Sequence, residues 1–274
     1  MTEQPKVSVI MGIYNCENTL PQAVDSILAQ TYPNWELVMC DDGSTDGTYA
    51  VAEEYRKTNP EKIILLKNDR NRKLSYTLNR CLEAATGELI ARMDGDDMSH
   101  ADRLQRQVDY LCSHPEIQLV GTQMHSFDEN GFHGIMRPPA HPCVKDLISD
   151  TSFYHATILT YRYVYDAIGG YCLEKRAERV EDIDLWFRFY ANRYAGVNLD
   201  EPLYDVRVDF DTIRRRTLQA RIHSIETRAA GYKLVGFPRY WLIKPGFILF
   251  VKGLVPPRIT ALLRKARAKR RNLI

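Results

Sequence analysis

Apolar runs alternate with helix-like segments along the first 113 residues of this 274-residue chain. The apolar runs predict buried strands at 7–13, 35–40, 62–67 and 88–93. The segments between and after them predict helices at 18–30, about 47–57, 74–86 and from Asp102 to about Ser113. This alternation of strand and helix is typical of an α/β fold with a mostly parallel central sheet flanked by helices.

The pattern is less regular after residue 113. A strand is expected near 118–124, and three prolines within 137–142 indicate a loop. Residues 154–196 mix helices and turns. Within this stretch a helix is expected to begin at Glu181 and Asp182, because apolar residues follow them at helical spacing.

Polar residues follow three of the predicted strands. Tyr14 and Asn15 come after the first, Asp41 and Asp42 end the second, and 94–97 follows the fourth. Ligands of parallel sheets bind beyond the carboxyl ends of the strands. We therefore expect these three clusters to converge on one crevice.

The most informative cluster is Asp94, Asp96 and Asp97, which places three carboxylates within four residues. Crowded carboxylates repel one another unless a cation lies among them. Hard oxygen ligands favour Mg²⁺ or Mn²⁺, and Mg²⁺ usually completes its shell with substrate phosphates. The cluster predicts a metal–diphosphate site, although a solvated turn or a helix N-cap would look similar.

The turn at 41–47, Asp-Asp-Gly-Ser-Thr-Asp-Gly, suits a loop that contacts a nucleotide. A carboxylate at a strand end can accept a hydrogen bond from a base or a ribose. The alternative is simple N-capping of the next helix by Ser44, Thr45 or Asp46.

A second acidic pair, Glu181 and Asp182, stands at the start of a predicted helix. The helix dipole stabilises anions there, so the pair suits either end-capping or a general base kept ionised by its surroundings. His155 is compatible with a contact to a metal or an acceptor, or with a structural role.

With these motifs the chain resembles the family 2 glycosyltransferases of the GT-A fold. The resemblance covers 6–190, about two-thirds of the chain, and its combination of motifs is highly specific. The matching motifs are 7–11 with Tyr14-Asn15, 41–46, 94–97, 169–171, and Glu181-Asp182 with Leu185-Trp186 and Arg188.

The resemblance implies roles for individual residues. Tyr14 and Asp42 would contact the nucleotide base, and Asp94 would lie by the ribose and the metal. Asp96 would ligate the metal, Mn²⁺ or Mg²⁺, and Asp182 would be the catalytic base. Glu181 and His155 are candidates for acceptor or metal contact.

Three departures from the family pattern bear on specificity. Family members often have Pro where this chain has Gly12, and Gly within the segment that here reads 71–74. Lys73 in that segment could reach a phosphate of the donor. The Gln-x-x-Arg-Trp motif of processive relatives is absent from the sequence, which favours transfer of one sugar per encounter.

Charge divides the chain into two parts. Residues 1–211 hold 21 basic and 34 acidic residues, whereas 212–274 hold 16 Lys or Arg and one acid, Glu226. We therefore predict a GT-A domain at 1–211 and a basic, partly apolar, helical extension at 212–274. Residues 240–255 combine aromatic residues with lysines but are too short and broken to span a bilayer, so an interfacial segment is expected.

The predicted function is metal-dependent, inverting transfer of a sugar from a nucleotide-diphosphate donor, UDP-linked, to a saccharide or lipid-linked acceptor. The basic extension favours an anionic membrane surface over nucleic acid, for which no motif is present. Six scattered cysteines and an N-terminus without a signal-peptide pattern favour a cytoplasmic location, peripheral on the inner face of the membrane.

Two other classes of protein share some of these features. A sugar-1-phosphate nucleotidyltransferase should carry a Gly-rich, basic phosphate loop after the first strand, where this chain has 12–17, Gly-Ile-Tyr-Asn-Cys-Glu. A non-catalytic nucleotide-sugar-binding subunit would not need Asp94, Asp96 and Asp182 together.

Overall fold

The computed structural model describes residues 4–148, 152–208, 218–243 and 246–247. Its strands are β1 (Val7–Ile13), β2 (Trp35–Asp41), β3 (Ile63–Lys67), β4 (Leu89–Arg92), β5 (Met98–Ser99), β6 (Leu119–Asp128), β7 (Gly131–Met136), β8 (Leu159–Tyr161) and β9 (Gly196–Arg207). Its α-helices are α1 (Leu20–Leu28), α2 (Thr48–Thr58), α3 (Leu74–Ala84), α4 (Arg103–Ser113), α5 (Arg162–Ile168), α6 (Glu181–Ala191) and α8 (Leu218–Val235). Short 3₁₀ helices include η1 (Val144–Ile148), η2 (His155–Thr157), η3 (Lys175–Ala177) and η4 (Arg239–Leu242).

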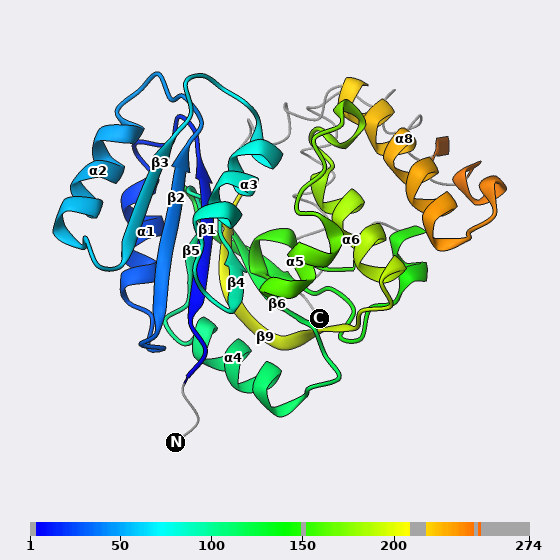
Figure 1. The fold of residues 1–274 in the computed structure, drawn as a ribbon, viewed down its shortest axis with the longest axis horizontal. Helices are drawn as coiled ribbons and strands as arrows, with labels where there is room; N and C mark the ends of the chain where they lie inside the picture. The colour runs from blue at the N-terminus through cyan, green and yellow to red at the C-terminus, as the bar shows by residue number, and fades with distance from the viewer. Residues whose placement is uncertain (1–3, 149–151, 209–217, 244–245, 248–274) are drawn as a thin grey trace.

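The described strands form one nine-stranded sheet in the order β3-β2-β1-β4-β8-β6-β9-β5, with β7 paired to β6 (Figure 1). The first four of these run parallel, and Val7 of β1 is level with Trp35 of β2 and Leu89 of β4. This register brings the carboxyl ends of β1, β2 and β4 to one edge of the sheet. The predicted α/β fold with its parallel core is confirmed.

The other half of the sheet is mixed. Strand β8 is antiparallel to both β4 and β6, whereas β6 and β9 are parallel. The strand expected near 118–124 is confirmed and extends to Asp128. Strands β5, β7, β8 and β9 add to the predicted set.

Side chains alternate between two apolar cores, one on each face of the sheet. In β1, Val9 and Met11 belong to the core that includes α1, α2 and α4. Ile10 points the other way, into the core that includes α3, α5, α6 and α8. Figure 1 shows α1 and α3 on opposite faces of the parallel strands. The sheet is therefore buried on both faces, as its nearly continuous apolar runs require.

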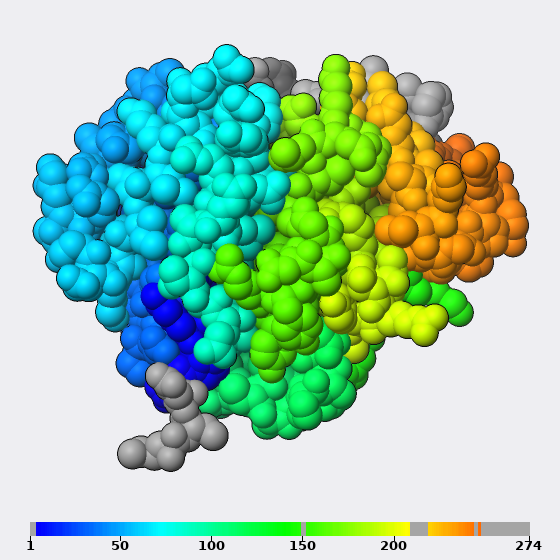
Figure 2. Space-filling model, viewed as in Figure 1, coloured from blue at the N-terminus to red at the C-terminus, as the bar shows by residue number. Residues whose placement is uncertain are grey.

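Helix α8 lies within the basic extension and packs against α6. Tyr232 of α8 is fully buried, and its ring centre lies 5.7 Å from that of Phe187 in α6. Gly231 lies so close to α6 that a Cβ added there would be 2.2 Å from Cδ2 of Phe187. In Figure 2 the gold and orange surface of α8 adjoins the yellow-green surface of the region that contains α6. Helix α8 is thus part of the folded body.

The predicted domain boundary at 211/212 lies outside the described residues, as does most of the predicted interfacial segment and the basic run 258–274. No helix among the described residues combines the length and the apolar character needed to cross a membrane.

Candidate active site

The three carboxylates after β4 gather at the end of the strand. One carboxylate oxygen from each residue lies within 4.8 Å of those from the other two, and Asp94 and Asp96 are half-buried. Asp97 is buried and accepts hydrogen bonds from the Tyr204 hydroxyl at 3.0 Å and the Arg207 backbone N–H at 2.8 Å. Burial and the charges of Asp94 and Asp96 raise the pKa of Asp97 well above its usual range. Asp97 therefore anchors the loop to β9, while Asp94 and Asp96 stay accessible.

This carboxylate loop suits the metal ion predicted from the sequence. All of its ligand atoms are carboxylate oxygens, which Mg²⁺ and Mn²⁺ prefer. A cation among them would relieve the repulsion that raises the pKa of Asp97. Asp94 and Asp96 are the two residues placed to hold such an ion.

A buried arginine lies behind the loop. Arg92, the last residue of β4, is 3% exposed and forms an ion pair with Asp94. Its charge also lowers the pKa of His155 and opposes the upward shift in the pKa of Glu181. Arg92 thus links the carboxylate loop with elements that follow much later in the chain.

The second acidic pair faces the same region. Glu181 is the first residue of α6. Burial raises its pKa to about 7, with further contributions from Asp182 and Asp94. Asp182 accepts the backbone N–H of Ile183 at 2.8 Å at this helix N-terminus, where the helix dipole favours negative charge. Glu181 therefore lies close enough to Asp94 and Arg92 for their charges to affect its pKa, although 87 and 89 residues separate them in sequence.

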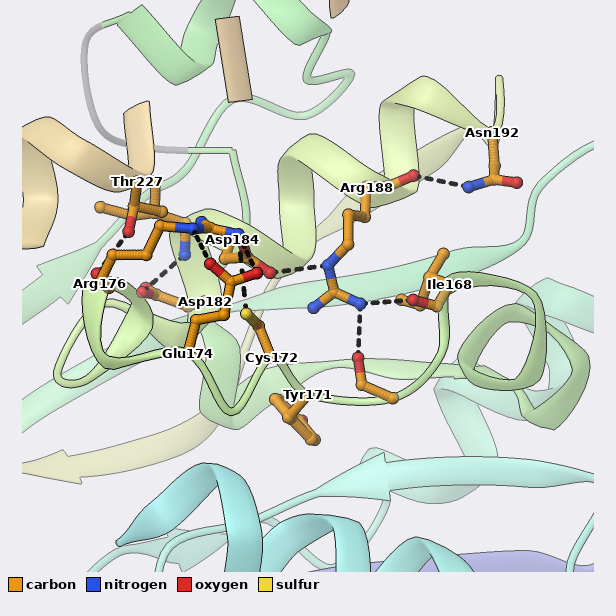
Figure 3. A network of polar contacts seen from close by, with 12 residues as sticks. Ile168, Tyr171, Cys172, Glu174, Arg176, Asp182, Asp184, Arg188, Asn192 and Thr227 are labelled. Atoms are coloured by element: carbon orange, nitrogen blue, oxygen red, sulfur yellow. Dashed lines mark hydrogen bonds and ion pairs between the residues drawn. The ribbon is translucent and has the colours of Figure 1, made fainter. Parts of the chain in front are cut away.

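A network of ion pairs and hydrogen bonds holds the first turn of α6 (Figure 3). The buried carboxylate of Asp184 accepts bonds from Arg176 and Arg188, each at 2.7 Å. Arg188 also donates to the carbonyl oxygens of Ile168 and Gly170, each at 2.6 Å. The Thr227 hydroxyl of α8 donates to the carbonyl of Arg176 at 2.5 Å. Helix α8 and the turn at 168–171 together fix the position of the acidic pair.

Two loops lie side by side at the ends of β1 and β2. The Asn15 side chain accepts the Thr45 N–H at 2.9 Å, and the Asn15 N–H donates to the Ser44 hydroxyl at 3.1 Å. Tyr14 is 45% exposed next to this contact. Its ring is therefore available to a planar ligand such as a nucleotide base.

Asp42 organises the neighbouring loop. One of its carboxylate oxygens accepts from the Asn68 side chain and the Arg72 N–H, both at 2.7 Å. The other accepts the Lys73 N–H at 2.9 Å. Lys73 has a positive φ of 73°, a conformation that a non-glycine residue adopts only when its surroundings impose it. Asp42 thus sets the direction of the segment before α3.

His155 is half-buried beside α6 and the turn at 168–171. Its Nε2 is 2.8 Å from the Tyr171 hydroxyl, which is 2.9 Å from the Tyr165 hydroxyl. The Trp186 ring stands nearly perpendicular to its imidazole, with the ring centres 6.1 Å apart. Burial and the charge of Arg92 lower the pKa of His155 well below its usual range, so the imidazole is neutral.

Sequence reasoning assigned no role to Arg92, Tyr204 or Arg207, which hold the carboxylate loop in place. Arg92 gave a signal, because a charged residue in an otherwise apolar strand needs a partner in the interior. Tyr204 and Arg207 gave no such signal in the sequence, because they follow Asp97 by more than 100 residues.

Comparison with solved structures identifies the fold. TarS of S. aureus (residues 1–349), crystallised in complex with UDP, has 19% sequence identity, covers 89% of this chain and 70% of its own, and gives a TM-score of 0.66. The mannosyltransferase PcManGT of Pyrobaculum calidifontis, in complex with GDP-Man and Mn²⁺, has 19% sequence identity and gives a TM-score of 0.61. The match covers 97% of this chain and 81% of the mannosyltransferase chain. The fold is that of the GT-A glycosyltransferases, as the sequence predicted.

Comparison with sequences gives the family. The model of Glycosyl transferase family 2 matches residues 8–178, so the chain belongs to this family and is a glycosyltransferase. It is 48% identical over 217 residues to "Putative glycosyltransferase EpsE" of Bacillus subtilis (strain 168). This alignment covers 79% of this chain and 78% of the relative. It is 38% identical over 193 residues, 70% and 73% of the two chains, to the Escherichia coli UDP-Glc:alpha-D-GlcNAc-diphosphoundecaprenol beta-1,3-glucosyltransferase WfgD.

Proposed function

We propose that this enzyme transfers one sugar per encounter from a UDP-linked donor to a hydroxyl of a saccharide or lipid-linked acceptor, with inversion, in the synthesis of a cell-surface polysaccharide or glycolipid. The observation that carries the proposal is the gathering of the Asp94, Asp96 and Asp97 carboxylates just beyond the carboxyl end of β4, close enough to Glu181 for Asp94 to contribute to its raised pKa. The UDP complex of TarS supports the donor, and the substrates named for WfgD support both donor and acceptor.

The donor side comprises the loops after β1, β2 and β4. Tyr14 and Asp42 would contact the base, Asp42 would also shape the loop around it, and Lys73 would be directed to the diphosphate. Asp94 and Asp96 would hold Mn²⁺ or Mg²⁺, which neutralises charge on the departing diphosphate. The Mn²⁺ complex of PcManGT supports a metal of this kind.

On the acceptor side, Asp182 would take the proton from the acceptor hydroxyl as its oxygen attacks the anomeric carbon. The bond between that carbon and the diphosphate oxygen breaks in the same displacement, which inverts the anomeric centre. Glu181, with a pKa of about 7, would carry a proton part of the time and could donate a hydrogen bond to the acceptor. His155 would support the acceptor wall through Tyr171.

The proposal includes a location at the cytoplasmic face of a membrane. The 16 basic residues of 212–274 would be attracted to anionic lipids. Within this region, Tyr240, Ile243 and Phe247 are exposed and line an open pocket of about 490 Å³. Apolar and aromatic groups of this kind suit the lipid interface.

A donor screen tests the proposal. Thermal shift and turnover would be measured with UDP-glucose, UDP-N-acetylglucosamine, UDP-galactose and GDP-mannose, each with Mn²⁺, Mg²⁺ or excess chelator. We expect one UDP-sugar to stabilise the protein with metal and to yield UDP, with a β-linked product from an α-linked donor. Full turnover in excess chelator would exclude the metal role. Consumption of UTP and a sugar 1-phosphate with release of pyrophosphate would instead identify a nucleotidyltransferase.

A further inference from the structure

A second group of potential metal ligands lies outside the proposed donor site. His100 follows β5, His125 lies in β6 and Asp205 lies in β9. Nε2 of His100 is 2.9 Å from Oδ1 of Asp205, and Nδ1 of His125 is 3.0 Å from the same oxygen. The three potential ligand atoms all lie within 4.8 Å of one another. The sheet register explains the convergence, because Asp205 is level with both His125 and Met98.

The chemistry of this cluster differs from that of the carboxylate loop. Two imidazole nitrogens and one carboxylate form a ligand set typical of Zn²⁺. Tetrahedral Zn²⁺ with bonds of about 2.0–2.1 Å holds its ligand atoms about 3.4 Å apart. The separations in the cluster, from 2.9 Å to at most 4.8 Å, bracket this value. Small movements of the side chains would admit the ion.

Access and charge also suit a cation. The side chains of His100 and His125 are 34% and 27% exposed, so water can reach the cluster and supply a further ligand. Asp205 is only 11% exposed, and both imidazoles direct a ring nitrogen to the same carboxylate oxygen, Oδ1. A carboxylate group therefore lies at the centre of the cluster.

We propose that His100, His125 and Asp205 form a second metal site, which binds Zn²⁺ and ties β5, β6 and β9 together. The site would act at a distance on the donor loop. Two residues beyond Asp205, Arg207 donates its backbone N–H to Asp97 at 2.8 Å and its guanidinium to the Asp96 carbonyl at 3.1 Å. An ion at the cluster would steady the strand that holds the carboxylate loop without touching donor or acceptor.

Metal titration of the full chain tests this site. The starting protein would carry Cys112→Ser and Cys143→Ser, because these exposed thiols could bind zinc themselves, and Asp96→Asn, to weaken the carboxylate site. We expect one equivalent of Co²⁺ to give a visible absorption band that Zn²⁺ abolishes, and Zn²⁺ to raise the Tm. In this background, His100→Gln or His125→Gln should lower the affinity for Zn²⁺ by more than the roughly 10- to 100-fold that loss of an outer-shell partner costs.

His114→Gln is the matched control, because it removes a histidine that stacks on Tyr110 in α4 instead. It should leave the Zn²⁺ affinity unchanged. If His125→Gln does not fold, as judged by circular dichroism, the more exposed His100→Gln decides. Absence of Zn²⁺ binding in the starting protein, or equal binding by a folded His100→Gln protein, would overturn the proposal and leave the cluster as a hydrogen-bonded network only.

Discussion

At the scale of single residues, the two neighbouring carboxylates at the start of α6 have different surroundings. Glu181 is held where burial raises its pKa to about 7, so near neutral pH it is protonated much of the time. A protonated carboxyl cannot accept a proton, whereas an ionised one can. A protonated Glu181 can donate a hydrogen bond, which suits the role proposed for it, while Asp182 is the residue proposed as the base.

Substitution separates the two roles. Asp182→Asn should reduce kcat by roughly 10²-fold or more, the usual contribution of a positioned base, with donor affinity almost unchanged. Glu181→Gln preserves the neutral hydrogen-bonding form and should cost less than roughly 10-fold in kcat. Steady-state kinetics and donor titration provide the measurements. Loss of donor affinity in Asp182→Asn in step with the rate would move Asp182 to the donor site.

The metal assignment depends on Asp96. Asp96→Asn should abolish most turnover because it removes a charged ligand, and its half-buried position at the end of a strand should leave the fold intact. Mn²⁺ binding, measured by electron paramagnetic resonance, should weaken in parallel. Asp102→Asn, a change eight residues after Asp94 and outside the cluster, is the control and should bind Mn²⁺ normally. Unchanged Mn²⁺ affinity in Asp96→Asn would remove this residue from the ligand set.

At the scale of elements, the packing of α8 on α6 can be tested through Gly231. Alanine normally stabilises a helix relative to glycine by about 1 kcal/mol. Here the added Cβ would lie 2.2 Å from Cδ2 of Phe187. Overpacking of this kind lowers the free energy of unfolding by about 1–3 kcal/mol, which should outweigh the gain in helix stability. Denaturant unfolding should show Gly231→Ala to be less stable than the native chain. Ala230→Ser, at an exposed neighbouring position, should change stability little, and a stabilised Gly231→Ala protein would contradict this packing.

The elements that the sequence predicts best are those with local signals. Strands β1, β2 and β4 are buried on both faces and β3 is partly buried, so their apolar runs could be recognised in the sequence. The rule for the carboxyl ends of parallel strands then brought Asp42 and Asp94 to one edge. Strand β9 was not predicted, because residues such as Asp200, Glu201 and Pro202 interrupt its apolar pattern. The support that it gives Asp97 through Tyr204 and Arg207 is a long-range contact without a local pattern.

The acidic pair on α6, Glu181 and Asp182, also shows that long-range contacts cannot be predicted from local sequence patterns. Its position at a helix start could be predicted from the sequence, but its coupling to Arg92 and Asp94 could not. That coupling needs the sheet to place β4 next to β8, and the Asp184 network to orient α6. Local patterns thus gave the parts of the site, while packing of distant segments sets their relation.

At the scale of the whole molecule, Glu36 of β2 is bonded to β1 and to the segment that precedes β4, at the edge of the sheet opposite the proposed site. Its buried carboxylate accepts from Lys6 and Ser8, each at 2.6 Å, and from the Thr86 N–H at 2.7 Å. Burial alone would raise the pKa of Glu36, but these hydrogen bonds, beginning with that from Lys6, lower it overall. The ionised form therefore stabilises the folded state.

Glu36→Gln should reduce the free energy of unfolding at pH 7 by about 1.5–3 kcal/mol, the range for hydrogen bonds to a charged group. A carboxylate whose pKa is lowered by folding contributes stability above its unfolded pKa of about 4.3 and loses it as the pH falls through the folded value. The difference between the two proteins should therefore be largest above about pH 5 and shrink in more acid solution. Urea unfolding across this range is the measurement. Glu53→Gln, at an exposed ion pair on α2, should change little, and a difference independent of pH would contradict the ionised role of Glu36.

Membrane docking involves the molecule as a whole, because it would orient the site toward acceptors held in a bilayer. The test truncation should remove 248–274 and keep Phe237 and Trp241, whose rings pack 4.9 Å apart beside Tyr232. The removed segment carries eight Lys or Arg and no acid. Each basic residue near an anionic surface contributes about 1 kcal/mol, so its loss should sharply weaken binding to phosphatidylglycerol vesicles.

Transfer to a lipid-linked acceptor should then fall more than hydrolysis of the donor, because only the acceptor is confined to the membrane. The full chain should release from vesicles as salt rises, since screening weakens surface attraction. Any salt-resistant part should depend on the exposed Ile243 and Phe247, and Ile243→Ser with Phe247→Ser should reduce it. A melting curve establishes that the truncated protein is folded. If that folded protein binds anionic vesicles as tightly as the full chain, the basic segment is not the membrane anchor, and the acceptor must reach the site by another route.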